Sequence, residues 1–351
     1  MMTFRNGRLE SLIYDHRLTK QIADLQEYRG RQTLYQKQEP EALQAMRQMA
    51  MIQSVESSNR IEGIFVSSAR LPILIKEGAA PQNRSEAEVV GYREVLHTIH
   101  QHALDIRLNP NTILQLHRDL MRYVGSGGRW KTTDNVVEVV FPDGKKEVRF
   151  VPVPAWQTEM AMDELCDSFL RYRELNSVPE LVLIAAFILD FLSIHPFPDE
   201  NGRMARLLVL LLLYQSGYEV GRYISLERIV EDTKDRYYET LYLSSQGWHE
   251  GQHHLNPWLE YVLLMVQMAY QRFEERVQLD FTQKRGWKED WIRAAVFKQH
   301  HRFTVADLEV WCPWASRAML SRVLNKMSHE GVIVCEKRGR HAEWKVIQKS
   351  E

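Results

Sequence analysis

The sequence predicts a mainly α-helical protein with a small β-hairpin and a separate C-terminal segment, and three observations support this fold class. Long stretches carry apolar residues at helical spacing, and two of them, 181–194 and 207–214, are apolar on nearly every side. Strand formers alternate around a turn at 135–152, which predicts the hairpin. After residue 280 the pattern changes to three shorter helices followed by two strands.

The composition is that of an ordinary globular protein. The chain has 351 residues, of which 44% are apolar and 26% charged, with a net charge of −1, so it can hold two or three domains. The longest apolar run, 207–213, is shorter than the roughly 20 residues that a membrane helix needs, and the first residues lack the apolar core of a secretion signal. We therefore expect a cytoplasmic location and no membrane partner. Three scattered cysteines suggest neither a disulfide framework nor a cysteine metal site.

The first predicted domain is an N-terminal helical region, residues 1–110. Within it, residues 41–59 form an amphipathic pattern that ends in the sequence Ser-Ser-Asn-Arg-Ile-Glu-Gly at 57–63. A glycine at this point suits a helix stop. Taken alone, the segment predicts a helix with a surface glutamate.

The most informative segment is 193–206, which lies between the two apolar helices. Two prolines predict that the first helix ends near His195, and the second helix should begin near Asn201. The start of a helix directs free N–H groups and a positive dipole at an anion. Arg203 and Arg206 share one face of the first turn and suit phosphate oxygens, while Asp199 suits Mg²⁺. His195 can accept a proton, so the chemistry implied is attack by a hydroxyl on a nucleotide phosphate.

The same segment resembles the signature of the Fic family, HxFx(D/E)GNGRxxR. The matching positions are His195, Phe197, Asp199, Asn201, Gly202, Arg203 and Arg206. Most proteins of this family are adenylyltransferases, which move AMP from ATP to a Ser, Thr or Tyr hydroxyl of a target protein. The resemblance implies a Fic-type helical catalytic core at residues 111–280.

The resemblance also implies roles for individual residues. His195 would be the general base, Asp199 would hold Mg²⁺, and Arg203 and Arg206 would bind the β- and γ-phosphates. The implied ATP-binding set is Glu200, Asn201, Gly202, Arg203, Met204, Ala205, Arg206 and Tyr238, with Tyr238 near the adenine. The implied cofactors are ATP, as co-substrate, and Mg²⁺.

One residue departs from the signature, because Glu200 replaces the first glycine of the usual Gly-Asn-Gly. If the loop needs a positive φ here, the glutamate is strained and its charge repels phosphate. If φ is negative, the side chain points to water and only the backbone N–H matters. A third interpretation places Glu200 beside Asp199 at the metal. We expect the second, because the other signature residues are present.

A second motif resembles the inhibitory motif of the same family, (S/T)xxxE(G/N), at Ser58, Glu62 and Gly63. The resemblance implies that Glu62 pairs with Arg206. Such a pair would deny Arg206 to the γ-phosphate and hold ATP in an unproductive pose. The hypothesis is an autoinhibited enzyme whose inhibitory helix, about residues 41–63, precedes the catalytic core.

The predicted hairpin at 135–152 is either a plain surface hairpin or a docking element. It resembles the family's flap, which pairs with an extended stretch of the target protein and brings its hydroxyl to the histidine. The preceding sequence, Gly-Arg-Trp-Lys at 128–131, resembles the family's lead-in to that flap. The partner implied is a target protein.

The C-terminal segment, 285–351, resembles a winged-helix domain. It holds 13 Lys and Arg against 8 Asp and Glu, a net charge of 13 − 8 = +5. Five basic residues would suit a DNA groove and backbone, and they are Arg317, Arg322, Lys326, Arg338 and Arg340. Winged helices also bind proteins or pair subunits, so a homodimer stays open as well.

Two classes of function follow. The first is a protein adenylyltransferase, and removal of AMP or transfer of another group stays open within the family. The second is a DNA-binding regulator whose Fic-like core senses a nucleotide, and the presence of His195 favours the enzyme because a sensor needs no base. The cluster His249, His253 and His254 could suggest a metal site, but neighbouring glycines favour a loop.

Overall fold

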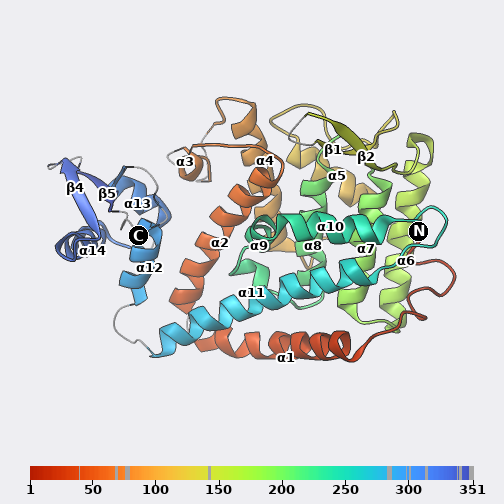
Figure 1. The fold of residues 1–351 in the computed structure, drawn as a ribbon, viewed down its shortest axis with the longest axis horizontal. Coiled ribbons are helices and arrows are strands. Elements are labelled where there is room, and N and C mark those ends of the chain that lie inside the picture. Colours follow the sequence, from red (N-terminus) through yellow and green to blue (C-terminus); the bar gives the residue numbers. More distant parts are fainter. Residues whose placement is uncertain are drawn as a thin grey trace.

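The computed structural model describes residues 1–38, 40–67, 70–75, 80–140, 144–282, 287–297, 299, 302–312, 315–337, 339 and 342–347. The fold is mainly helical with few strands, as the sequence predicts. A large helical body carries a two-stranded hairpin near one edge, and the C-terminal elements form a smaller group beside it (Figure 1). In the part of the chain that the structure describes, no helix is both long and apolar enough to cross a bilayer.

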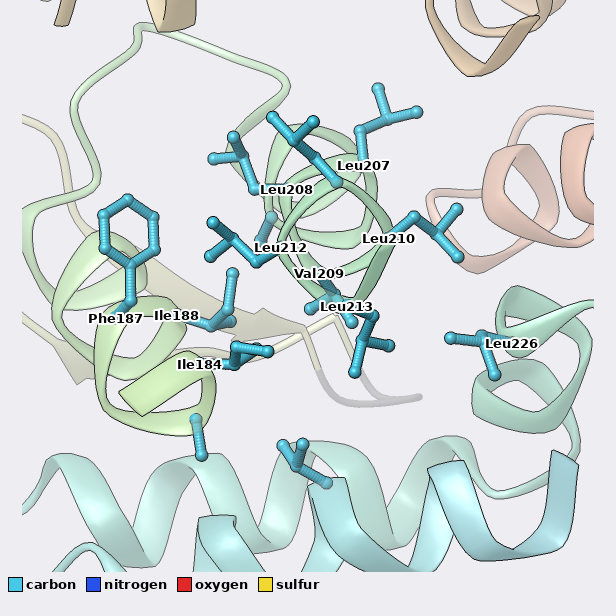
Figure 2. Close-up of a cluster of buried hydrophobic side chains, with 14 of the residues drawn as sticks. Ile184, Phe187, Ile188, Leu207, Leu208, Val209, Leu210, Leu212, Leu213 and Leu226 are labelled. Atoms are coloured by element: carbon cyan, nitrogen blue, oxygen red, sulfur yellow. The ribbon is translucent and has the colours of Figure 1, made fainter. Parts of the chain in front are cut away.

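The two helices that flank the signature lie at the centre of the large body. They are α7 (Glu180–Ile194) and α8 (Asn201–Gln215), and every residue of α7 from Leu181 onward is buried. Figure 2 shows side chains of both helices, such as Ile188 and Leu212, in one apolar cluster with Leu226 of α9 (Leu226–Asp232). Full burial of each such side chain contributes about 2 kcal/mol. The short polar loop 195–200 is therefore anchored at both ends in the core.

The remaining helices of the body surround this pair. Helix α2 packs against α4 and α9, α6 and α11 pack against α7, and α1 lies along α11. Their bounds are α1 His16–Gln38, α2 Pro40–Ile61, α3 Leu71–Ile75, α4 Arg84–His102, α5 Pro110–Leu120, α6 Thr158–Leu175, α10 Lys234–Ser245 and α11 Asn256–Thr282. Two short 3₁₀ helices, Ala155–Gln157 and Val220–Arg222, complete the set.

The predicted hairpin has its two strands in place. Strand β1 (Val137–Val140) pairs antiparallel with β2 (Lys146–Phe150), with Val140 opposite Lys146. Gly144 adopts a φ of 81°, which favours glycine. The predicted turn residues Pro142 and Asp143 lie outside the described part of the chain.

The C-terminal group has its own apolar core, which includes Leu308, Leu320, Ile333 and Trp344. Its elements are α12 Trp287–Phe297, β3 Phe303–Thr304, α13 Val305–Trp311, α14 Arg317–His329, β4 Ile333–Lys337 and β5 Glu343–Val346. The strands form one sheet in the order β3-β5-β4. The two-residue strand β3 was not anticipated, because it is too short to show an alternating pattern. The winged-helix assignment stays a prediction.

Two of the basic residues on α14 have acidic partners. Arg317 lies 3.4 Å from Glu309, and Lys326 lies 2.6 Å from Glu289. The two basic residues predicted at the tip of the wing, Arg338 and Arg340, lie outside the described residues. Neighbouring carboxylates therefore offset part of the positive charge that α14 carries.

The N-terminal residues pack into the large body, which sequence reasoning did not foresee. Phe4 and Leu9 are buried, and Thr3 donates a backbone hydrogen bond of 3.1 Å to the buried Asp190 of α7. His253 lies 2.9 Å from the Thr3 hydroxyl. The histidine-rich segment is thus in part a packing element of the core.

Four histidines in the body have depressed pKa values because burial disfavours their charged form. The pKa is about 3 for His100 and about 4 for His117, His195 and His253. The unfolded chain binds these protons near pH 6.5 and the folded chain does not, so acid favours unfolding in this window.

We therefore expect the free energy of unfolding to fall by more than about 2 kcal/mol as the pH is lowered from 7 to 4.5. Burial raises the pKa of Asp190 to about 6 and that of Glu200 to about 7, which acts in the opposite sense, but these are two groups against four. Urea unfolding across a pH series measures the change. A constant stability down to pH 4.5 would contradict buried neutral histidines.

Candidate active site

His195 occupies the end of α7 in a left-handed conformation, with φ 50° and ψ 61°. Its ring nitrogen Nδ1 lies 3.3 Å from the carbonyl oxygen of Leu192. A carbonyl only accepts, so Nδ1 carries the proton and Nε2 is left as an acceptor. Burial lowers the pKa of His195 to about 4 despite the nearby carboxylates of Glu62 and Asp199. The imidazole is therefore neutral at pH 7 and suited to act as a base.

A buried lysine holds the loop that carries His195. The backbone N–H of Lys131 donates to Pro196 at 2.8 Å, and its ammonium donates to the carbonyl of Ile194 at 3.0 Å. The ammonium also contacts Asn135, whose amide donates to the carbonyls of His195 and Phe197. The four successive carbonyls of residues 194–197 thus accept hydrogen bonds from the side chains of Lys131 and Asn135 and from the backbone N–H of Lys131. The sequence identified Lys131 only as part of a lead-in and missed this function.

Hydrogen bonds between Asn201 and Phe197 stabilise the loop on its buried side. The Asn201 carboxamide accepts from the backbone N–H of Phe197 at 2.9 Å and donates to its carbonyl at 2.8 Å. The buried Phe197 ring stacks on His117, with 3.7 Å between ring centroids. The side chain of Asn201 therefore maintains the loop, and only backbone groups of this residue face an anion site. Met204 and Ala205 are almost fully buried in the core, and the backbone N–H of Met204 donates to the carbonyl of Glu200 at 2.9 Å.

The expectation for Glu200 was wrong. Its φ is 71° and ψ 9°, and its side chain is buried rather than directed to water. The loop needs the positive φ to begin α8, which is why glycine is usual here, and a glutamate in this region costs on the order of 1 kcal/mol. One carboxylate oxygen pairs with Arg203, while the other, Oε2, has no hydrogen-bond partner among the described residues.

Both terminal nitrogens of Arg203 bind protein groups, whereas its buried Nε has no hydrogen-bond partner among the described residues. Its Nη1 donates to Asn59 of α2 at 2.8 Å, and its Nη2 donates to Glu88 of α4 at 2.9 Å as well as to Glu200. The residue is 2% exposed. Two carboxylates therefore share one guanidinium, which links α2, α4 and the start of α8.

Arg206 pairs with Glu62. Its Nη2 lies 2.7 Å from Oε1 of Glu62, and its Nε donates to the hydroxyl of Ser58 at 2.9 Å. Burial alone would raise the pKa of Glu62, but Arg206 outweighs burial and lowers it, so the carboxylate is charged. A Cβ at Gly202 would lie 2.5 Å from the same Glu62 oxygen. The glycine thus lets the carboxylate approach the start of α8, where an anion is favoured.

The end of α2 places Glu62 in this position. Gly63 adopts a φ of 79°, and the N–H of Ile64 bonds back to Asn59 at 2.9 Å, which forms a glycine-terminated helix end of the Schellman type. The ammonium of Lys234 binds the carbonyl of Ile61 at 2.8 Å, and Ser54 binds the buried Glu227 of α9 at 2.6 Å. Polar contacts, as well as apolar packing, therefore fix the helix.

Two further predicted residues lie around this centre. Asp199 is exposed, and its Oδ1 accepts from the backbone N–H of Glu200 at 2.9 Å. Among the described residues no three acidic, histidine or cysteine side chains group as a metal site. A lone exposed carboxylate fits Mg²⁺ that takes its other ligands from phosphates and water. Tyr238 on α10 is 37% exposed, and its ring lies 5.8 Å from the ammonium of Lys234.

The comparisons with known proteins agree with this geometry. Residues 107–213 match the model of the Fic/DOC family. The chain is 24% identical over 269 residues to protein adenylyltransferase fic-1 of Caenorhabditis elegans, covering 74% of this chain and 47% of the relative. It is 24% identical over 212 residues to protein adenylyltransferase Fic of Drosophila grimshawi, covering 59% of this chain and 40% of the relative. The chain therefore spans less than half the length of these curated relatives.

The fold is similar to that of a crystallised Fic family protein from Desulfovibrio desulfuricans. The TM-score is 0.60 at 20% identity, and the match covers 97% of this chain and 98% of the other. A structure of Fic-1 residues 134–508 from C. elegans gives a TM-score of 0.59 at 21% identity, with 75% and 73% coverage. The signature loop, the helices around it and the family match agree: the chain contains a Fic/DOC family domain.

Lys131→Met should weaken the His195 loop, because the carbonyl of Ile194 and the side-chain oxygen of Asn135 lose their buried cation. We expect a loss of about 1–3 kcal/mol in the free energy of unfolding. The pKa of His195 should rise, since Lys131 is one of the groups that lower it. Denaturant unfolding and NMR titration of the imidazole nitrogens measure both effects.

Lys131→Arg should retain most of the stability and the low pKa of His195. Substitution of an exposed lysine, Lys20→Met, is the matched control. An unchanged His195 pKa in Lys131→Met would contradict this account of the loop.

Proposed function

We propose that this protein is an adenylyltransferase that moves AMP from ATP to a hydroxyl of a target protein and that Glu62 holds it inactive. The observation that carries the proposal is the convergence of a neutral His195, the start of α8 and Arg206 around one loop. His195 would accept the proton of the attacking hydroxyl. The start of α8 would bind the α-phosphate through its N–H groups.

Magnesium and the two arginines would complete the site. Asp199 would supply one oxygen ligand, and the bound ion would offset charge on the phosphates. Arg206 would bind the terminal phosphate in place of Glu62, and Arg203 would bind the β-phosphate. Tyr238, partly exposed on α10 near Lys234, would contact the adenine of ATP.

The inhibitory role of Glu62 is supported by the position of its carboxylate. Oε1 bonds to Arg206 and lies so close to Gly202 that no Cβ would fit between them. A terminal phosphate needs the same guanidinium, and two anions cannot share it without loss of binding energy. The burial and capping of α2 give Glu62 a fixed place, so displacement requires movement of the helix end or of the side chain.

The target protein would dock beside the hairpin. Strand β1 has one neighbour, β2, so its outer edge is available for an added strand among the described residues. DNA binding receives less support, because Arg317 and Lys326 pair with acidic side chains. The C-terminal domain would then select the target or pair two subunits.

The test is transfer of label from α-³²P-ATP with Mg²⁺ into the protein itself and into a cell extract. We expect labelling to rise in Glu62→Gly by about tenfold or more, because the charged competitor for Arg206 is removed. It should fall by about 100-fold or more when His195→Ala is added.

Labelling that does not change in Glu62→Gly would contradict autoinhibition. An absence of label in every variant, with ATP bound, would contradict AMP transfer. Release of AMP from a modified protein by the parent, lost in His195→Ala, would instead favour removal of AMP. Glu56→Gln on the same helix is the matched control, because Glu56 faces Arg60 rather than Arg206.

A further inference from the structure

Glu200 is unusual in three ways that bear on Arg203. It is a buried carboxylate, it adopts a φ of 71° that disfavours side chains, and one of its oxygens has no partner among the described residues. Strained residues and buried polar atoms without hydrogen-bond partners persist where the surrounding structure and function require them. Nothing in the loop requires the carboxylate for folding, because glycine suits the same backbone better.

The guanidinium of Arg203 has partners besides Glu200. Glu88 of α4 binds Nη2 at 2.9 Å and Asn59 binds Nη1 at 2.8 Å. Glu200 binds the same Nη2 from the loop. Glu88 also pairs with Arg84 at 2.9 Å, so two carboxylates and two guanidiniums meet here. Glu200 is the carboxylate of this group that occupies Arg203 from the signature loop itself. It also lies at the start of α8, beside the N–H groups that favour an anion.

We propose that Glu200 is a second inhibitory carboxylate, which competes with a nucleotide phosphate for Arg203 as Glu62 competes for Arg206. The proposal rests on the proposed function and adds a residue that sets the affinity and phosphate selectivity of the same site. Each arginine of the signature then has its own carboxylate: Glu62 arrives from α2, while Glu200 belongs to the loop. Removal of Glu62 alone frees Arg206 and leaves Arg203 occupied.

The effect of Glu200 on Arg203 should depend on how many phosphates the nucleotide carries. The phosphate at Arg203 is one that a nucleoside di- or triphosphate carries and a monophosphate lacks. Loss of the Glu200 charge should therefore strengthen binding of ATP and ADP and leave AMP binding unchanged. A general reduction of negative charge near the loop would strengthen all three.

The experiment is calorimetric titration with α,β-methylene ATP, α,β-methylene ADP and AMP, with Mg²⁺ at about pH 8, where an ordinary glutamate is ionised. These two analogues cannot transfer AMP, so the readout is affinity and not turnover. The proteins are the parent, Glu62→Gly, and Glu62→Gly combined with Glu200→Gln or with Glu200→Gly. The glutamine keeps the size and the strained backbone and removes only the charge, whereas the glycine also removes the strain.

We expect both double variants to bind the ATP and ADP analogues at least about tenfold more tightly than Glu62→Gly, with AMP unchanged. Glu86→Gln in the Glu62→Gly background is the matched control. It removes a carboxylate of α4 that pairs with Arg70, so no comparable gain should follow.

Equal affinities in Glu62→Gly and in both double variants would overturn this inference and leave the proposed function standing. An equal gain for AMP, or an equal gain from Glu86→Gln, would overturn the assignment to Arg203. Absence of nucleotide binding in all the proteins would overturn the proposed function and this inference together. Thermal unfolding of each variant verifies that affinities are compared between folded proteins.

Discussion

The site depends on the burial of two arginines at the start of α8. Arg203 and Arg206 are 2% and 5% exposed, and a guanidinium removed from water needs anionic or strongly polar partners. The protein supplies these partners itself: Glu62 and Ser58 for Arg206, and Glu88, Glu200 and Asn59 for Arg203. Helices α2 and α4 are attached to the signature through these contacts. In the proposed function, binding of a nucleotide would release carboxylates from these arginines.

The central position of the arginines follows from the two apolar helices around them. Because α7 and α8 are buried along their length, the loop 195–200 has little freedom, and Lys131 with Asn135 fixes its carbonyls. His195 is consequently held in a left-handed conformation with its ring beside a carbonyl that sets its tautomer. A rigid loop of this kind reduces the reorganisation that a reaction at its surface needs.

Much of this arrangement could be predicted from the sequence, and the exceptions have physical causes. The ends of α7 and the start of α8 follow from two prolines and apolar periodicity, and the match of residues 107–213 to a known family agrees with the signature. The conformation of Glu200 was mispredicted, because its buried side chain contacts Arg203, and Arg203 is itself held by Asn59 and Glu88, which are far away in the sequence. The contacts of Lys131 and Thr3 were missed for the same reason, since each joins residues far apart in the chain. Pairing of the basic residues on α14 likewise depends on neighbours outside that helix.

The most direct measurement of the central claim is a pair of crystal structures with α,β-methylene ATP and Mg²⁺, one of the parent and one of Glu62→Gly. The account predicts that Arg206 stays on Glu62 in the parent and binds the terminal phosphate in the variant, with the start of α8 on the α-phosphate in a productive pose. A terminal phosphate bound to Arg206 in the parent, with Glu62 still in place, would contradict it. So would a variant in which Arg206 contacts no phosphate.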